Sequence, residues 1–206
     1  ENATTAEIQE ATQAVTAASK TDKADRDAMN TKANDAVTAA QTGNQATEPG
    51  VIDAIKNLQD LQTKAATDDA DALTADIDQA IADLATAQET AAGNQETARD
   101  AAKAAIAETE PVSYEDTVST ARKALDKLLA DPVASTQDIQ NATKALTEAT
   151  AAEKDKRDAI NTEADSYITD VQNSAQASEP TVVSALNALQ EMQAEAATDS
   201  SAGLTG

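Results

Sequence analysis

The sequence predicts an all-α protein of tandem three-helix-bundle repeats that share long junction helices and together form an elongated rod. Three observations carry this prediction: a composition almost free of aromatic residues, an internal repeat, and apolar residues at helical spacing. Only 1% of the 206 residues are aromatic, whereas 40% are hydrophobic. Aromatic side chains usually fill the thick core of a globule. Their scarcity favours thin bundles of closely packed helices.

The charge is strongly acidic, with 37 Asp and Glu residues against 15 Lys and Arg residues and a formal net charge of -22. Nucleic-acid binding needs basic residues that displace counterions, and anionic membrane surfaces attract basic segments as well. We therefore expect neither nucleic acid nor membrane as a partner. The charge also favours solubility and mutual repulsion between chains, so a monomer is expected.

The chain contains no His and no Cys, which removes the commonest general base and the preferred zinc ligands. The densest acidic cluster is Asp68, Asp69 and Asp71, but the matching segment 199–202 reads DSSA and lacks two of these acids. A calcium site needs about six to eight oxygen ligands, so a solvated turn is the favoured interpretation. We expect no enzyme activity and no catalytic, cofactor-binding or metal-binding residue.

An internal repeat is the main signal. Residues 26–31 (RDAMNT) return as 157–162 (RDAINT), and the Glu-Pro pair at 48–49 returns at 179–180, in both cases 131 residues later. Without a gap, roughly 32 of 71 aligned pairs between residues 5 and 75 and their copies are identical, which is the signature of a repeat architecture.

A weaker repeat lies inside the long one, because residues 76–80 resemble residues 138–142 at an offset of 62. Two related unit types are therefore expected to alternate. The expected divisions are residues 1–18 as the last helix of a preceding unit, 19–91 as a type A unit, 92–150 as a type B unit, and 151–206 as the first two helices of a further type A unit. On this interpretation the chain is an excerpt of a longer array.

Each unit is expected to contain three helices. In the type A unit the first runs from about 22 to 45, and the second begins at Pro49, where proline is tolerated because first-turn amides have no helical partner. The third follows an acidic turn. Their apolar residues recur at spacings of three and four: Met29, Ala33, Val37 and Ala40; Val51, Ile55, Leu58 and Leu61; Leu73, Ile77, Ala80, Leu84 and Ala87.

The junctions between units decide the expected shape. No Gly or Pro lies in residues 150–157, so one helix is expected to continue from about Thr136 to Gln176. The upstream copy is expected to continue from about Thr5 towards Gln45. Ser135 is expected to cap the downstream helix, since a hydroxyl accepts a free first-turn N–H. At Gly93 and Asn94 we expect a bend or a short break.

Four segments of the type B unit resemble the FIVAR repeat ("found in various architectures"): 114–118 (YEDTV), 125–129 (LDKLL), 135–139 (STQDI) and 142–146 (ATKAL). The resemblance covers about 50 residues, and the type A unit matches less well. FIVAR-like repeats occur in large cell-wall-attached surface proteins of Gram-positive bacteria. The resemblance implies a tandem three-helix unit, an extracellular location and an adhesion-related architecture, but no binding residues.

The leading functional hypothesis is a stalk whose partners are the neighbouring repeats of the same chain. The alternatives are a helical module that recognises a host extracellular protein or glycan, and an intracellular coiled-coil scaffold. Tyr114 and Tyr167 are expected to pack in a core or at its rim and not to stack on a ligand. Lys123 and Lys127 are expected to lie on a solvated face.

Overall fold

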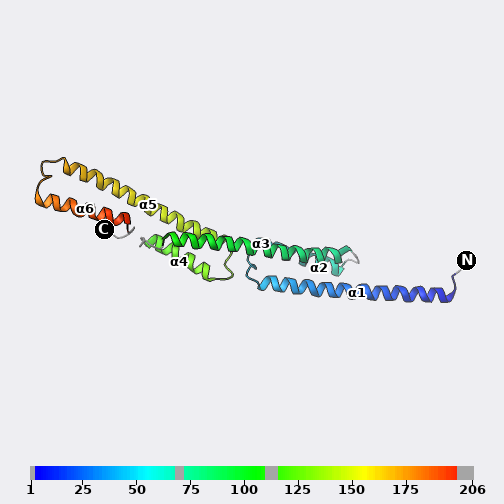
Figure 1. Ribbon diagram of the computed structural model, residues 1–206. Coiled ribbons are helices and arrows are strands. Elements are labelled where there is room, and N and C mark those ends of the chain that lie inside the picture. The colour runs from blue at the N-terminus through cyan, green and yellow to red at the C-terminus, as the bar shows by residue number, and fades with distance from the viewer. Residues whose placement is uncertain (1–2, 68–71, 110–115, 199–206) are drawn as a thin grey trace. The chain divides into compact units, whose positions relative to one another are not determined.

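The structure is a computed structural model that describes residues 3–67, 72–109 and 116–198. This part of the chain forms six α-helices and contains no strand (Figure 1), so the predicted all-α class is confirmed. The acidic cluster of residues 68–71, its copy at 199–202, and Tyr114 lie outside the described residues. The helices are α1 (Thr5–Thr42), α2 (Pro49–Thr67), α3 (Ala72–Thr109), α4 (Asp116–Ala130), α5 (Thr136–Gln172) and α6 (Pro180–Thr198).

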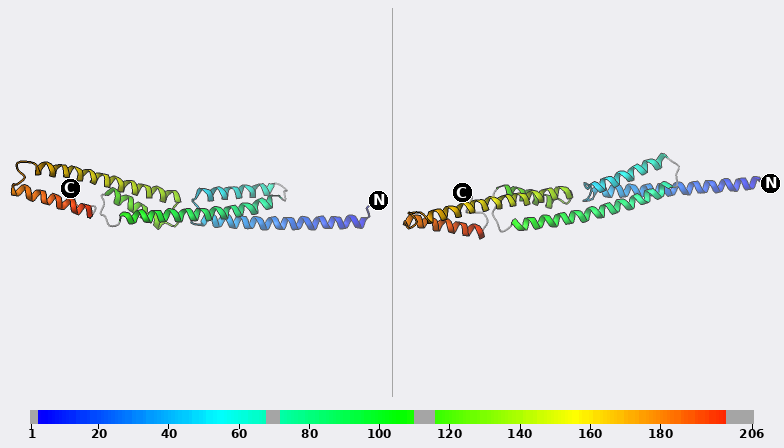
Figure 2. Two further views of the ribbon diagram at one scale, coloured as in Figure 1. Left: turned by 45° about the horizontal axis from the view of Figure 1, so that its top comes forward. Right: turned by 90° about the horizontal axis from the view of Figure 1, so that it is seen from above.

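The chain divides into two compact units, Glu1–Asn94 and Gln95–Gly206, and α3 contributes residues to both. The first unit has a core drawn from the second half of α1, from α2 and from the first part of α3. Both views in Figure 2 place α2 beside the second half of α1. The buried residues of this core are Ala33, Val37, Ala40, Val51, Ile55, Leu58, Ile77, Ala80, Leu84 and Ala91.

These buried residues follow the predicted apolar stripes. Val51 and Leu58 are 0% exposed, and Ile77 and Leu84 are 2% and 1% exposed, so the predicted seam on α3 from Ile77 onward is confirmed. Ala33 is also fully buried. A methyl group cannot fill a wide gap, so its burial requires close approach of the helices. This is how a core without aromatic residues reaches the packing density of a protein interior.

The second unit has its own core, formed by the later part of α3, by α4 and by the beginning of α5. Its most deeply buried side chains include Leu125, Ile139 and Leu146, each 0% exposed, and Val118 at 1%. The remaining buried members are Ala98, Ala102, Ile106 and Ala134. Further along the unit, α5 continues and forms an antiparallel hairpin with α6 (Figure 1).

The predicted continuous helices are confirmed: α5 spans 37 residues, α1 spans 38, and each ends three or four residues before the expected end. Their interiors contain neither Gly nor Pro, so nothing opposes helix propagation once it has begun. Ser135 caps α5 as predicted, because its hydroxyl oxygen accepts the amide of Asp138 at 3.1 Å.

Of the bend or short break expected at Gly93 and Asn94, the break is wrong, because α3 runs through both residues without interruption. A glycine inside a helix costs only about 1 kcal/mol relative to alanine. Ala91 is buried in the first core, and Gln95 is buried in the second unit. Packing contacts on both sides of the glycine therefore outweigh its weak local preference.

Candidate functional site

An open, largely apolar groove runs along the second hairpin. It has a volume of about 620 Å³ and is lined by side chains of α5 and α6. We refer to it as the α5–α6 groove. Its lining residues are Tyr167, Asp170, Val171, Ser174, Gln176, Thr181, Val182, Ala185, Leu186 and Leu189. Val182 and Leu189 of this lining match Val51 and Leu58 of the predicted stripe at the offset of 131.

The internal repeat explains why this groove is open. Val182 and Leu189 match Val51 and Leu58 at the offset of 131. Val51 and Leu58 are 0% exposed in the first unit, whereas Val182 and Leu189 are only half-buried. The same loss of burial affects Val171, which replaces the fully buried Ala40.

Other positions of the second hairpin keep their burial. Ile168 is 7% exposed like its counterpart Val37, and Leu186 is 8% exposed like its counterpart Ile55. Val37 and Ile55 belong to the same core as Val51 and Leu58, together with Ile77, Ala80 and Leu84 of α3. Burial is thus lost in the second copy at Val182 and Leu189 and kept at Ile168 and Leu186.

The two hairpins are held by the same polar contacts. Gln62 on α2 donates from Nε2 to the backbone oxygen of Asn30 at 3.4 Å and to Oδ1 of Asn34 at 3.0 Å. Gln193 on α6 donates to the backbone oxygen of Asn161 at 3.4 Å and to Oδ1 of Asp165 at 3.0 Å. The second hairpin therefore has the geometry of the first.

The turns of the hairpins also agree. The amide of Glu48 bonds to the backbone oxygen of Gln45, and the amide of Glu179 bonds to that of Gln176, each at 3.0 Å. Equal turns and equal bridges mean that the second hairpin offers the same face as the one α3 covers in the first unit.

The charges along this face differ between the copies. In the first unit Lys32 on α1 forms an ion pair with Asp78 on α3. Its counterpart in the second hairpin is Glu163, and Asp170, which lines the groove, stands where the first copy has Ala39. Helix α5 therefore carries an acidic residue at the position of Lys32, outside the lining of the groove, and a second one, Asp170, within that lining.

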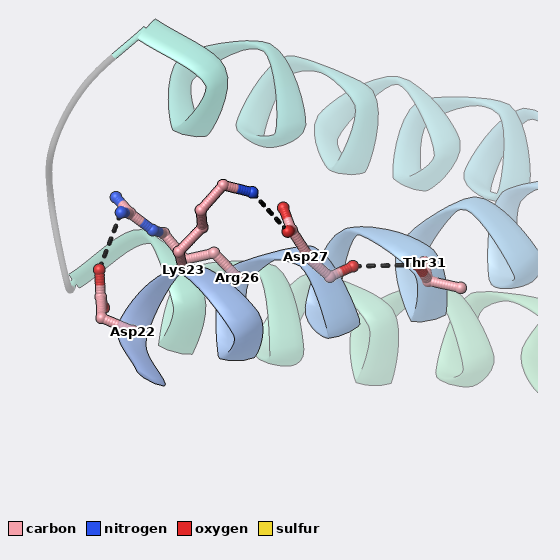
Figure 3. A network of polar contacts seen from close by, with 5 residues as sticks. All are labelled: Asp22, Lys23, Arg26, Asp27 and Thr31. Carbon is pink, nitrogen blue, oxygen red and sulfur yellow. Dashed lines mark hydrogen bonds and ion pairs between the residues drawn. The ribbon is translucent and has the colours of Figure 1, made fainter. Parts of the chain in front are cut away.

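A cluster of ion pairs on α1 also recurs, but its position indicates a stabilising role only. Figure 3 shows Lys23 bonded to Asp27 at 2.7 Å, Arg26 paired with Asp22 at 2.8 Å, and the hydroxyl of Thr31 donating to the backbone oxygen of Asp27. Most of these side chains are well exposed. Exposed pairs of this kind contribute about 0.2–1 kcal/mol.

On α5 Lys154 and Asp158 repeat the first pair at 2.8 Å. The hydrogen bond from Asp158, followed by its charge, raises the pKa of Lys154 above its ordinary value. The pair belongs to the solvated face of α5, because both of its side chains are exposed.

Two polar side chains that the sequence analysis missed hold the loop between α4 and α5. Gln95 on α3 donates from Nε2 to the backbone oxygen of Ala134 at 2.7 Å. Arg99, one turn later, donates to the backbone oxygens of Leu129 and Asp131 at 2.8 and 2.6 Å. Arg99 therefore satisfies carbonyls at the end of α4 that lack a helical partner. No local pattern distinguishes these two residues from other polar residues of α3.

The sequence-predicted candidates have mixed outcomes. Tyr167 does not lie in a core, because it is 64% exposed and lines the α5–α6 groove. Lys123 and Lys127 are exposed, as predicted. Among the described residues no group of three or more acidic side chains could hold a metal ion.

No helix in the described parts of the chain is long and apolar enough to cross a membrane. Comparison of the chain with protein-family models, curated proteins and solved structures found no match. The resemblance to FIVAR repeats therefore remains a prediction from the quoted segments.

Proposed function

We propose that this chain is a non-enzymatic spacer: tandem three-helix repeats that form the stalk of a bacterial cell-surface adhesin and hold a binding domain away from the cell wall. The observation that supports it best is the origin of the two cores. Each is drawn from three helices that are close in sequence, and α3 contributes to both. Contacts limited to neighbours allow an array to grow without changing its units.

The composition supports the same function. The formal net charge of -22 keeps neighbouring stalks apart at a crowded surface by mutual repulsion. Continuous helices of 37 and 38 residues correspond to about 55 Å each at 1.5 Å per residue. Each such helix spans a long distance with only 37 or 38 residues.

Small-angle X-ray scattering tests this proposal. A compact particle of this length has a radius of gyration of about 17 Å by the usual scaling, whereas a rod three helices thick gives about 30 Å from the helical rise. The matched comparison is a chain extended by one further 131-residue period. The stalk predicts a longer particle with an unchanged cross-section, and an increase in cross-section would contradict it.

A helical binding module is the second candidate, and the α5–α6 groove favours it. The groove is largely apolar, with Tyr167 as its one aromatic residue. A protein helix suits such a surface better than a glycan, which requires a denser set of polar contacts. Binding of a host protein that persists when the groove is blocked by Ala185→Arg would place recognition elsewhere.

A further inference from the structure

We propose that the α5–α6 groove is a docking site for an amphipathic helix of the α3 type that carries a basic residue in place of Asp78. The occupant is the third helix of a related repeat and not a small molecule, a glycan or helix α1 of a second copy. The inference rests on the two copies of the hairpin within this chain. It does not depend on the proposed stalk function.

The first unit shows what covers this face. Ile77, Ala80 and Leu84 of α3 are 1–2% exposed and lie in one core with Val51 and Leu58. The second hairpin repeats the turn and the Gln–Asn bridge of the first, so it presents equivalent positions to an equivalent helix. A helix with apolar residues at spacings of three and four would bury the half-exposed Val182 and Leu189 in the same way.

Two substitutions adapt the groove to a different sequence. Tyr167 and Val171 replace Ala36 and Ala40, so the end of the groove near the turn is lined by larger side chains. The occupant therefore needs small residues there, or Tyr167 must fold over it. The α3 sequence has Ala87 and Ala91 at that end of its own stripe.

Charge selects the occupant further. The contact that Lys32 makes with Asp78 in the first unit becomes a contact with Glu163 in the second. An acidic residue at the Asp78 position of the docked helix would face the like charge of Glu163, whereas Lys or Arg there would form an ion pair with Glu163. Asp170, seven residues further along α5, is a second acidic residue and lines the groove. The groove thus selects against a helix identical to α3 and favours one with the charge reversed.

The test uses the full 206-residue chain and a labelled peptide of residues 72–91, with binding followed by fluorescence anisotropy. Gln79→Lys in the peptide allows its amine to condense with the Asp83 carboxyl, with loss of water, into a lactam bridge that holds the peptide helical; Gln79 and Asp83 are exposed and already bonded at 2.8 Å. We expect the D78K peptide to bind roughly three- to ten-fold more tightly than the unchanged peptide, the range given by reversing one exposed ion pair. The chain variant E163K should reverse that preference.

Ala185→Arg, which places a long side chain at the groove, should weaken binding at least ten-fold. Ala188→Arg is the matched control, because Ala188 is exposed on α6 and does not line the groove. Binding that ignores Ala185→Arg would mean that the peptide displaces α3 in the first unit, and the proposal would fail. It would also fail if the bridged peptides did not bind, or if E163K left the order of affinities unchanged.

Self-association of the chain is the remaining outcome. Helix α1 carries exposed Ile8 and Val15, at 57% and 69%, and could occupy the groove of a second copy. Dimerisation in analytical ultracentrifugation that is removed both by Ala185→Arg and by Ile8→Asp would assign the groove to α1, and would overturn the assignment to an α3-type helix.

Discussion

Gln95 on α3 and Ala134, in the loop that precedes α5, are joined by a buried hydrogen bond of 2.7 Å from the Gln95 side chain to the Ala134 backbone oxygen. Gln95 is 6% exposed and Ala134 is also 6% exposed. The bond links a helix to a loop 39 residues further along the chain. Ala134 directly precedes Ser135, the residue that caps α5, so the bond holds the loop next to the start of that helix.

Replacing Gln95 with Leu should destabilise the second unit by about 1–3 kcal/mol, because the buried oxygen of Ala134 loses its donor. Urea unfolding followed by circular dichroism measures the change, and hydrogen exchange around residues 131–139 locates it. Gln79→Leu is the control, since the exposed Gln79 bonds only within its own helix. Equal effects of the two substitutions would show that the bond to Ala134 contributes nothing specific.

Leu58 and Leu189 occupy equivalent positions, but only Leu58 is fully buried. Leu58→Ala should therefore cost about 2–5 kcal/mol, the range for a buried leucine that leaves a cavity. Leu189→Ala should cost about 1 kcal/mol or less, since less apolar surface returns to water. Hydrogen exchange of α2 and of α6 reports the two local stabilities separately. If both substitutions cost the same, the α5–α6 face is covered in solution.

Gly93→Ala should stabilise the chain by about 0.5–1 kcal/mol, because alanine has less backbone freedom to lose in a helix. A Cβ atom at Gly93 meets no atom within 4 Å, and no described glycine has a positive φ. Gly43→Ala is the comparison: its Cβ would lie 3.3 Å from the backbone oxygen of Ala39, so it should gain less or lose stability. Thermal unfolding by circular dichroism measures both. A destabilised Gly93→Ala would mean that α3 departs from a regular helix there.

The start of α1 should weaken on acidification. Thr4 and Glu7 form a capping box in which Glu7 accepts the backbone amide of Thr4 at 2.7 Å and its hydroxyl at 2.8 Å. These two hydrogen bonds, the backbone one first, lower the pKa of Glu7 below its ordinary 4.5. A carboxyl with a lowered folded-state pKa stabilises the fold above its unfolded pKa, and the effect is lost as pH falls through the folded value.

The measurement is the pH dependence of carbon chemical shifts at residues 5–10 between pH 6 and pH 2. The helicity of residues 5–10 should decline as the pH falls below about 4.5, which is close to the ordinary pKa of a glutamate carboxyl. Glu7→Gln should remove this local transition, while residues of α4 serve as an internal reference. A transition of unchanged size in Glu7→Gln would attribute it to the general protonation of the acidic chain.

The capping box illustrates how much local sequence predicts. Thr4 and Glu7 show the spacing of that motif, and Ser135 with Asp138 shows the same three-residue spacing. Only the second was identified beforehand. The apolar stripes were identified for the same reason: a helix places residues three and four apart on one face whatever surrounds it. That geometry places Val51 and Leu58 on one face of α2, and Ile77 and Leu84 on one face of α3.

The candidate site was beyond such reasoning. From the sequence, Tyr167 was expected in a core or at its rim and not against a ligand. Whether a stripe is buried depends on a partner helix distant in sequence, and no spacing within α5 or α6 contains that information. The Gln95 and Arg99 contacts to the α4–α5 loop were missed on the same ground, since their acceptors lie 30–39 residues away.

By itself the sequence determined the helices, their repeat at an offset of 131 and their apolar faces, because these depend on backbone geometry and neighbouring residues. The tertiary structure alone decided that α3 continues through Gly93. It also decided that Val182 and Leu189 stay half-exposed while Val51 and Leu58 are fully buried. The physical reason is the same in both cases. A glycine inside a helix costs only about 1 kcal/mol relative to alanine, so packing contacts on either side of it can keep the helix continuous. The burial of a side chain requires a second surface that covers it, and that surface comes from a segment distant in sequence.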